Sequence, residues 1–456
     1  MQTPADLAFL AAKESLVLLK NADSFLPLAG ASSGAGTRSG TRRSSPIAPH
    51  AAGTDRRQQR AKRTIAIIGP HFNSTTDILG NPGYRGTNTL IFERSPLQEL
   101  QRRFPHQEQH AHATEISYAE GCPISHPADP GAIDAAADVA AQADVVFLFL
   151  GLNAEVEDES LDRLTLALPG DQNALVNRVI AAARGPIVAV LINGGMVAVP
   201  TLKESPKVAS ILECFYPGQA GSAAIFGAIF GDFSPAGALP ATIYGTDLEQ
   251  QRSVRDLKLR NGVGITYMFY TGTPLWEFGE GLTYTSFGLS ASPAGRGDVP
   301  AGGAAGTAAS SLSTVTTAAM AASFPEYFAS KGAKPSPASF AVTAENVGGF
   351  KSGCVVFGFL QYPNHGTAAT ADAPPPLQRL FDFVRVPEIA PRDRFTVTLS
   401  IPAQVLALTT SAGAEVLLPG NYTVVIRTSN LAEHAIVKTL VVTGEPATLS
   451  TFPTYT

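Results

Sequence analysis

Four short runs of apolar residues, rich in valine and isoleucine and bounded by glycine, proline or aspartate, constrain the fold most. They cover residues 64–69, 145–150, 187–192 and 209–215. Strands without polar alternation are typical of a parallel sheet that is buried on both faces. Stretches of a length suited to crossover helices lie between them, at residues 132–143, 171–183 and 219–230. The sequence therefore predicts an α/β fold, an open and mostly parallel sheet covered by helices, over roughly residues 1–245.

The second half of the chain has a different pattern. After residue 338, short runs of alternating apolar and polar residues recur between glycine, proline and asparagine turns, which predicts a β-sandwich over residues 339–446. Residues 30–63 and 291–338 hold few large apolar side chains, so we expect a disordered insert and a low-complexity linker. The predicted organisation is an α/β domain over residues 1–290 that contains the insert, then the linker, then the sandwich.

Charge and cysteine content exclude several classes of protein. The net charge is −5, although residues 31–63 alone carry eight basic residues and one acidic residue. The rest of the chain is acidic, so a nucleic-acid partner is not expected. No apolar run of about 18 residues predicts a membrane span, and the first residues lack the pattern of a signal peptide. The cysteines Cys122, Cys214 and Cys354 allow at most one disulfide bond.

No cofactor or metal is predicted. No glycine-rich phosphate loop follows any of the predicted strands. His106, His110 and His112 have a metal-like spacing, but they lack the glutamate of H-E-x-x-H, and a solvated polar segment is the better interpretation.

An acidic loop follows the predicted strand 145–150. Residues 151–163 contain five carboxylates and one arginine. Ligands of open α/β sheets bind beyond the carboxyl ends of the strands, where this loop begins. Crowding raises the pKa of some carboxyl groups, and a carboxyl group that is protonated near neutrality can act as a general acid. A solvated acidic loop and a calcium site are the alternatives, and the lack of a supporting glycine counts against calcium.

Eight motifs occur along most of the chain in one order, and together they carry a resemblance to a known family. They lie at residues 11–28, 64–86, 95–100, 118–124, 143–172, 215–244, 265–287 and 344–360. Among them are YAEGCPI at 118–124 and AENVGGFKSGCVVFGFL at 344–360. The chain resembles the C-terminal half of family 3 glycoside hydrolases, most closely the branch of β-xylosidases and α-L-arabinofuranosidases.

The resemblance implies a fold and a set of site residues. It implies a six-stranded α/β sandwich domain followed by a fibronectin-type-III-like domain. The pattern E-x-E-G-x-D-R of this branch aligns with residues 157–163, which places the general acid/base on Glu159. Glu157, Asp162 and Arg163 become supporting groups. Ser160 stands where the pattern has glycine.

The resemblance also implies a missing part. Members of the family begin with a (β/α)8 barrel that bears the nucleophilic aspartate, and no equivalent precedes Thr3. A retaining glycosidase needs two carboxylates about 5 Å apart. We therefore expect half an active site, which acts on an oligosaccharide when a barrel is present in cis or in trans, and no nucleophile in this chain.

The expected function is retaining hydrolysis of terminal β-linked xylose or arabinose from xylo-oligosaccharides. A β-glucosidase and a non-catalytic carbohydrate-interacting or structural remnant are the alternatives. An extracellular location is expected from the resemblance, and the triplets at Asn73 and Asn421 would permit glycosylation there.

Overall fold

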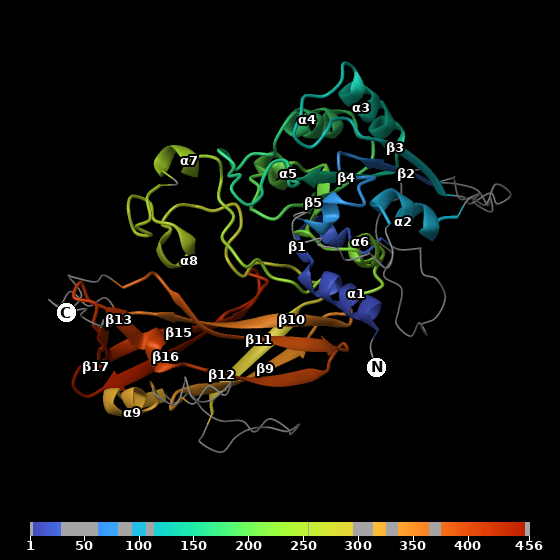
Figure 1. Ribbon diagram of the computed structural model, residues 1–456. Helices are drawn as coiled ribbons and strands as arrows, with labels where there is room; N and C mark the ends of the chain where they lie inside the picture. Colours follow the sequence, from blue (N-terminus) through green and yellow to red (C-terminus); the bar gives the residue numbers. More distant parts are fainter. Residues whose placement is uncertain are drawn as a thin grey trace.

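The protein is described from a computed structural model, which covers residues 3–28, 63–80, 94–105, 114–253, 255–294, 313–324, 336–363 and 375–451. An α/β unit lies against a β-sandwich, and the chain passes from the first to the second near residue 287 (Figure 1). The expected disordered insert, residues 30–63, lies outside the described residues except for Arg63, which begins a strand.

The α/β unit is built on a six-stranded sheet of order β1-β6-β5-β4-β2-β3. Only β1 is antiparallel to its neighbour. The strands are β1 (Val17–Asn21), β2 (Arg63–Ile68), β3 (Thr114–Ala119), β4 (Val145–Gly151), β5 (Ile187–Ile192) and β6 (Val208–Glu213). Every residue of β4, β5 and β6 is buried, as the continuous apolar runs predict. The predicted open, mostly parallel sheet is confirmed.

Helices cover both faces of this sheet. The side chains of Val146 and Leu148 pack with α3 (Ala132–Gln142), α4 (Gln172–Ala182) and α5 (Pro200–Glu204). Those of Phe147 and Phe149 pack with α1 (Pro4–Ser15), α2 (Pro96–Arg103) and α6 (Gly221–Phe230) on the other face. The short helices are η1 (Ala22–Ser24), η2 (Asp77–Leu79), α7 (Leu248–Gln251) and α8 (Thr266–Phe269). Two layers of helix therefore exclude water from a sheet that has no polar face.

The β-sandwich follows. Its larger sheet has the order β11-β10-β15-β16-β8, and two three-stranded sheets have the orders β12-β9-β7 and β13-β14-β17. The longer strands are β7 (Phe287–Pro293), β9 (Ser339–Asn346), β10 (Ser352–Gln361), β11 (Arg379–Ile389), β12 (Arg394–Ser400), β15 (Gly420–Thr428) and β16 (Ile436–Thr443). The shorter elements are β8 (Ser313–Thr316), α12 (Ala403–Leu406), β13 (Ala407–Thr409), β14 (Glu415–Leu417) and β17 (Ala447–Ser450). Alternate residues of β9 and β15 are buried, as an antiparallel sandwich requires.

The prediction of a linker over residues 291–338 is wrong for the residues that the structure describes there. Strand β7 extends into this segment and pairs with β9. Residues 313–316 form β8, which adds a parallel strand beside β16, and α9 (Thr317–Ala322) follows. The segment is poor in large apolar residues, but Val315 and Met320 bury their side chains in the sandwich core. Two such anchors, together with the backbone hydrogen bonds of an edge strand, order a segment whose composition predicts no regular secondary structure.

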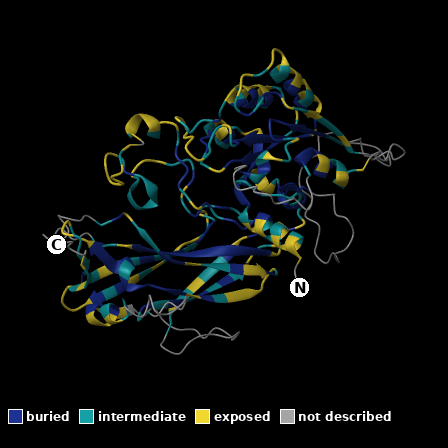
Figure 2. Ribbon diagram, in the orientation of Figure 1, coloured by how far each residue is buried: buried dark blue, intermediate teal, exposed yellow. Residues whose placement is uncertain are grey.

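The two units share an aromatic interface. Tyr267 and Phe278 of the first unit pack against Phe357 and Phe359 of β10. The Arg427 guanidinium lies 4.8 Å from the centroid of the Phe359 ring and donates to the Phe278 carbonyl at 3.1 Å. Buried residues follow the strands of both units (Figure 2). Among the described residues, no helix is long and apolar enough to cross a membrane.

Candidate active site

The acidic loop leaves β4 through a turn that only glycine permits. Gly151 has φ +145°, and a Cβ atom there would lie 1.8 Å from the Ile192 carbonyl oxygen. Asn153 then shapes the turn. Its carbonyl accepts from the amides of Val156 and Glu157 at 3.0 and 3.1 Å, and its side-chain oxygen accepts from the Glu155 amide at 3.1 Å. The start of the loop is therefore fixed to the carboxyl end of the sheet.

Glu157 is the anchored carboxylate of the loop. Its Oε1 accepts from the amides of Gly194 and Gly195 at 3.0 and 2.7 Å, and the Tyr216 hydroxyl donates to the same oxygen at 3.3 Å. Its Oε2 accepts from Arg163 Nε at 3.1 Å. The side chains of Glu157 and Arg163 are 18% and 13% exposed. Charge-assisted bonds in such a site are stronger than at the surface. This carboxylate holds the loop in place.

Glu159 lies at the tip of the loop, and its side chain is exposed. A tight turn positions it, because Asp158 and Leu161 exchange two backbone hydrogen bonds of 3.2 and 3.0 Å. The Glu159 amide donates to Asp158 Oδ1 at 2.6 Å. Ser160 has φ +67°, which explains why glycine is favoured at this position in the pattern. Within the described residues, the Glu159 carboxylate has no hydrogen-bond partner, so it is available to an incoming molecule.

The predicted supporting residues behave differently from one another. Glu157 and Arg163 form an ion pair, and Arg163 also donates to the carbonyl oxygen of Met196 at 2.8 Å. Asp162 is exposed and contacts none of the other three predicted residues through a hydrogen bond or ion pair in the part of the chain described. The fold thus brings together two of the predicted residues and leaves Glu159 and Asp162 facing solvent.

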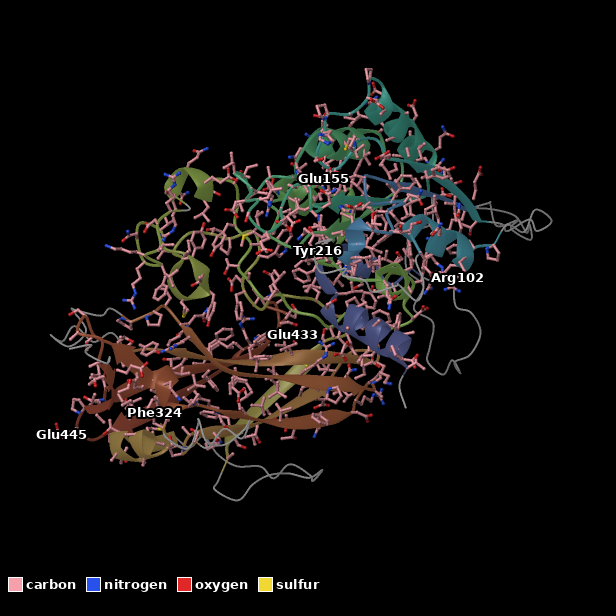
Figure 3. All side chains as sticks on the ribbon, viewed as in Figure 1. Arg102, Glu155, Tyr216, Phe324, Glu433 and Glu445 are labelled. Atoms are coloured by element: carbon pink, nitrogen blue, oxygen red, sulfur yellow. The ribbon has the colours of Figure 1, made fainter. Side chains whose placement is uncertain are left out.

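Three groups at this site were not predicted from the sequence. The Gly194 and Gly195 amides come from the segment that follows β5, and Tyr216 comes from the segment after β6, inside the α/β unit (Figure 3). Burial and the neighbouring Glu157 charge raise the pKa of Tyr216, so its hydroxyl remains a donor. The sequence did hold a signal, since Asn-Gly-Gly and Tyr-Pro-Gly directly follow two predicted strands.

Two buried titratable groups lie at the same edge of the sheet. Glu213 ends β6, and burial raises the pKa of its carboxyl to about 8 despite a hydrogen bond of 3.0 Å from the Phe215 amide. Burial lowers the pKa of His71, which follows β2, to about 4. Both groups are therefore neutral at pH 7 and enclosed by protein. In the described ranges, no group of three or more histidine, cysteine or acidic residues could hold a metal ion.

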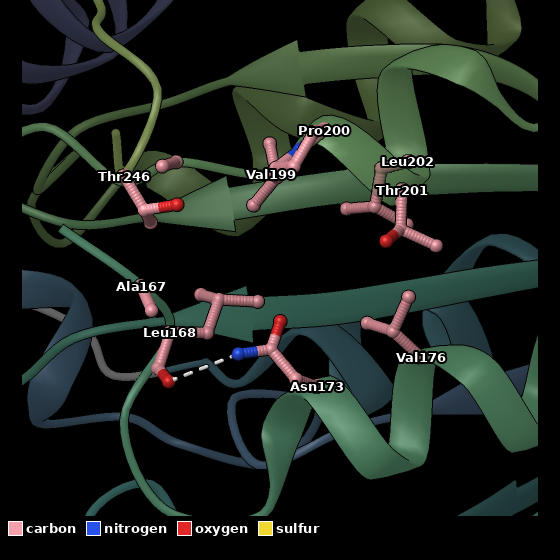
Figure 4. Close-up of a pocket in the computed structure, with 10 residues that line it drawn as sticks. Ala167, Leu168, Asn173, Val176, Val199, Pro200, Thr201, Leu202 and Thr246 are labelled. Carbon is pink, nitrogen blue, oxygen red and sulfur yellow. Dashed lines mark hydrogen bonds between the residues drawn. The ribbon is translucent and has the colours of Figure 1, made fainter. Parts of the chain in front are cut away.

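A pocket of about 980 Å³ opens beside the acidic loop. Residues 157–158 and 161–166 of the loop form one wall, and residues between 240 and 278 form the other. A smaller pocket of about 220 Å³ lies between residues 167–176 and 198–202, where Asn173 donates to the Leu168 carbonyl at 3.3 Å (Figure 4). Of these two pockets, the larger has a volume typical of ligand sites. Its lining residues Asp158 and Leu161 lie on either side of Glu159 in the sequence.

Comparison with known sequences agrees with the resemblance. Residues 58–284 match the sequence model of the glycosyl hydrolase family 3 C-terminal domain. A β-xylosidase/α-L-arabinofuranosidase 1 of Medicago sativa subsp. varia is 34% identical over 284 residues, which cover 61% of this chain and 31% of that protein. A probable exo-1,4-β-xylosidase, xlnD, of Aspergillus fumigatus is 29% identical over 451 residues, which cover 98% of this chain and 48% of that protein.

Solved structures show the same relationship. A family 3 exo-β-xylosidase (XlnD), determined in complex with a xylobiose aziridine activity-based probe, matches with a TM-score of 0.75 and 25% identity. The match covers 98% of this chain and 49% of that one. The β-D-glucoside glucohydrolase of Trichoderma reesei matches with a TM-score of 0.67 and 19% identity, which shows a shared fold. The chain spans about half the length, or less, of these relatives.

Proposed function

Residues 58–284 are a glycosyl hydrolase family 3 C-terminal domain, and from this we propose that the chain supplies the acid/base half of a β-xylosidase-type active site. The observation that carries the proposal is an exposed carboxylate, Glu159, on a loop that Glu157 anchors to two strand ends. A proton donor must reach the substrate while its loop stays fixed. The xylosidase names of the two relatives described above support the substrate class.

In the proposed mechanism, Glu159 protonates the glycosidic oxygen as the leaving group departs. A carboxylate from outside residues 1–456 attacks the anomeric carbon and forms a glycosyl-enzyme intermediate. Glu159, now ionised, then takes a proton from the water that releases the sugar, so the anomeric configuration is retained. Glu157 and Arg163 remain paired throughout and hold the loop. The second carboxylate would come from a barrel domain, joined in cis or supplied in trans.

The test uses a chimera in which this chain replaces the part of the Aspergillus fumigatus relative that it matches, so that the remainder of that relative supplies the proposed barrel. Glu159→Gln should lower hydrolysis of xylobiose by about 10² to 10⁴, because its leaving group needs a proton. An activated aryl xyloside should still form the intermediate at nearly the parent rate, and azide should restore turnover with retained configuration.

Glu155→Gln is the matched control, because Glu155 is an exposed carboxylate of the same loop. It should keep the activity of the parent chimera on both substrates. Equal activity of Glu159→Gln and the parent on xylobiose would remove Glu159 from the acid/base role. Rapid hydrolysis of xylobiose by the chain without a barrel would contradict the proposal of half an active site.

A further inference from the structure

Glu213 is a buried carboxyl group that the proposed mechanism does not use. It ends β6, and it is only 3% exposed. Its Oε1 accepts from the Phe215 amide at 3.0 Å. This bond spans a tight turn, because Phe215 has φ +52°, a conformation that residues with a side chain rarely adopt. The turn positions the next residue, Tyr216, whose hydroxyl donates to Glu157. One anchor of Glu157 therefore depends on Glu213.

The other anchor of Glu157 leads to the same carboxyl group. Asn193 follows β5 and is buried, and its Nδ2 donates to the Gly195 carbonyl at 3.0 Å. The Asn193 side chain also forms a hydrogen bond with the Glu213 carboxyl group. The amides of Gly194 and Gly195 are those that donate to Glu157 at 3.0 and 2.7 Å. Glu213 thus contacts both of the segments that hold this carboxylate.

The protonated form of Glu213 suits these contacts better than the ionised form. Asn193 Oδ1 is buried and has no hydrogen-bond donor among the residues that the structure describes. A protonated carboxyl group has one hydroxyl to donate to such an acceptor, whereas a carboxylate only accepts.

No charged side chain balances an ionised Glu213 in the part of the chain described. The lysines of β1 and α5, which pack against β6, are Lys20 and Lys203, and both donate to backbone carbonyls. Arg163 is held in the ion pair of the acidic loop. The adjacent titratable group is the Cys214 thiol, and burial raises its pKa. An ionised Glu213 is therefore enclosed without a counter-charge, which is costly.

We infer that Glu213 is a positioning residue of the active site, which as a neutral carboxyl group holds the two segments that anchor Glu157 and, through them, the loop that carries Glu159. Its consequence for catalysis rests on the proposed function, whereas its contacts belong to this chain alone. Glu213 acts through Asn193 and Phe215 and does not touch the substrate.

The inference gives the anchors a pH dependence of definite sign. Where the two segments open to water, Glu213 ionises above its ordinary pKa of 4.5, and where they are closed it stays protonated up to about pH 8. Opening therefore becomes easier as the pH rises between these values. Glutamine has the shape of the protonated carboxyl group and does not titrate, so Glu213→Gln removes this dependence.

Amide hydrogen exchange in the isolated chain tests the inference without any activity. The exchange rates of the Gly194 and Gly195 amides are compared between the parent and Glu213→Gln at each pH, so that the intrinsic pH dependence of exchange cancels. The ratio of the parent rate to the variant rate should grow by up to about tenfold per pH unit between pH 5 and 7.5. Glu155→Gln, on the exposed part of the same loop, is the matched control and should keep a constant ratio.

The amide of Ala135 separates a local effect from a change in the whole unit. It donates to the Gly131 carbonyl at 2.9 Å in the first turn of α3, in the same α/β unit. Its exchange should be equal in the parent and in Glu213→Gln. A constant ratio at Gly194 and Gly195, or an equal rise at Ala135, would overturn the inference.

Asn193→Ala is a second variant, which tests the link between Glu213 and the two glycines. It removes the bond to the Gly195 carbonyl and leaves Glu213 in place. Exchange of the Gly194 and Gly195 amides should be at least about fivefold faster than in the parent at pH 5, as the loss of one buried hydrogen bond implies. Unchanged exchange would contradict the role given to Asn193.

The chimera described above tests the consequence for catalysis. The kcat for xylobiose of Glu213→Gln, divided by that of the parent, should rise at least about tenfold from pH 6 to pH 9 while the ratio of KM values stays constant. Ionisation of Glu159 affects both proteins alike and cancels in this ratio. A constant kcat ratio in an active chimera would overturn the positioning role. A chimera without activity would contradict the proposed function, and the exchange rates of Gly194 and Gly195 would then decide the inference by themselves.

Discussion

Glu157→Gln tests whether the anchored carboxylate holds the acidic loop. The substitution keeps the shape of the side chain and removes its charge. Glutamine retains one oxygen for the amides of Gly194 and Gly195, but it presents an NH2 group to Arg163 where Oε2 now accepts a bond of 3.1 Å. The two amide hydrogen bonds and the longer one of 3.3 Å from the Tyr216 hydroxyl become neutral ones, and the bond from Arg163 is replaced by a contact between two donors.

The expected magnitude follows from these contacts. Each amide bond loses about 1 kcal/mol when its acceptor is no longer charged. The pair with Arg163 is mostly shielded from water, so its loss costs about 1 kcal/mol more. The free energy of unfolding of the α/β unit should therefore fall by about 3 kcal/mol. Glu159→Gln is the matched control and should change it by less than about 0.5 kcal/mol, because its carboxylate is exposed.

The assay is guanidinium unfolding followed by tryptophan fluorescence. Trp276 is the only tryptophan in the sequence, and it is buried in the core of the α/β unit. Its fluorescence thus reports on this unit without a signal from the sandwich, which matters because two domains need not unfold together. If Glu157→Gln and Glu159→Gln give the same unfolding midpoint, the interpretation of Glu157 as the anchor of the loop is wrong.

Three further outcomes are expected. Glu213 is neutral in the folded protein up to about pH 8, whereas in the unfolded chain it ionises above its ordinary pKa of 4.5, so its burial makes stability fall as the pH rises between these values. Glu213→Gln should remove this loss, and its advantage over the parent in Trp276-monitored unfolding should grow by up to about 1.4 kcal/mol per pH unit between pH 5 and 7.5; a constant difference would contradict a raised pKa. Gly151→Ala should yield little soluble protein, because a Cβ atom would overlap a backbone carbonyl, whereas Gly349→Ala, with open space around its Cβ position, should express like the parent; equal yields would refute the steric argument. Arg427→Met should separate the calorimetric transitions of the two units, because Arg427, which stacks on Phe359 within the sandwich, donates across the interface to the Phe278 carbonyl; an unchanged thermogram would mean that the aromatic contacts alone couple them.

The sequence predicted the α/β unit because its strands are buried on both faces. A run such as residues 145–150 has no polar position, and only a doubly covered sheet accommodates it. The same reasoning located the acidic loop, since parallel strands bring their carboxyl ends to one edge. The antiparallel pairing of β1, and the addition of β8 and α9 to the sandwich, depend on contacts between residues far apart in the sequence, which local composition does not encode.

The distinction between the two loop glutamates, Glu157 and Glu159, also depends on contacts between distant residues. In the sequence, Glu157 and Glu159 are both carboxylates on one short acidic segment, and only the resemblance to the family pattern gives them different roles. The tertiary structure separates them physically. Amides from the segment after β5 and the hydroxyl of Tyr216, which are 37 to 59 residues away along the chain, converge on Glu157. No such group reaches Glu159 among the residues described, so burial and hydrogen bonding fix one carboxylate and leave the other exposed.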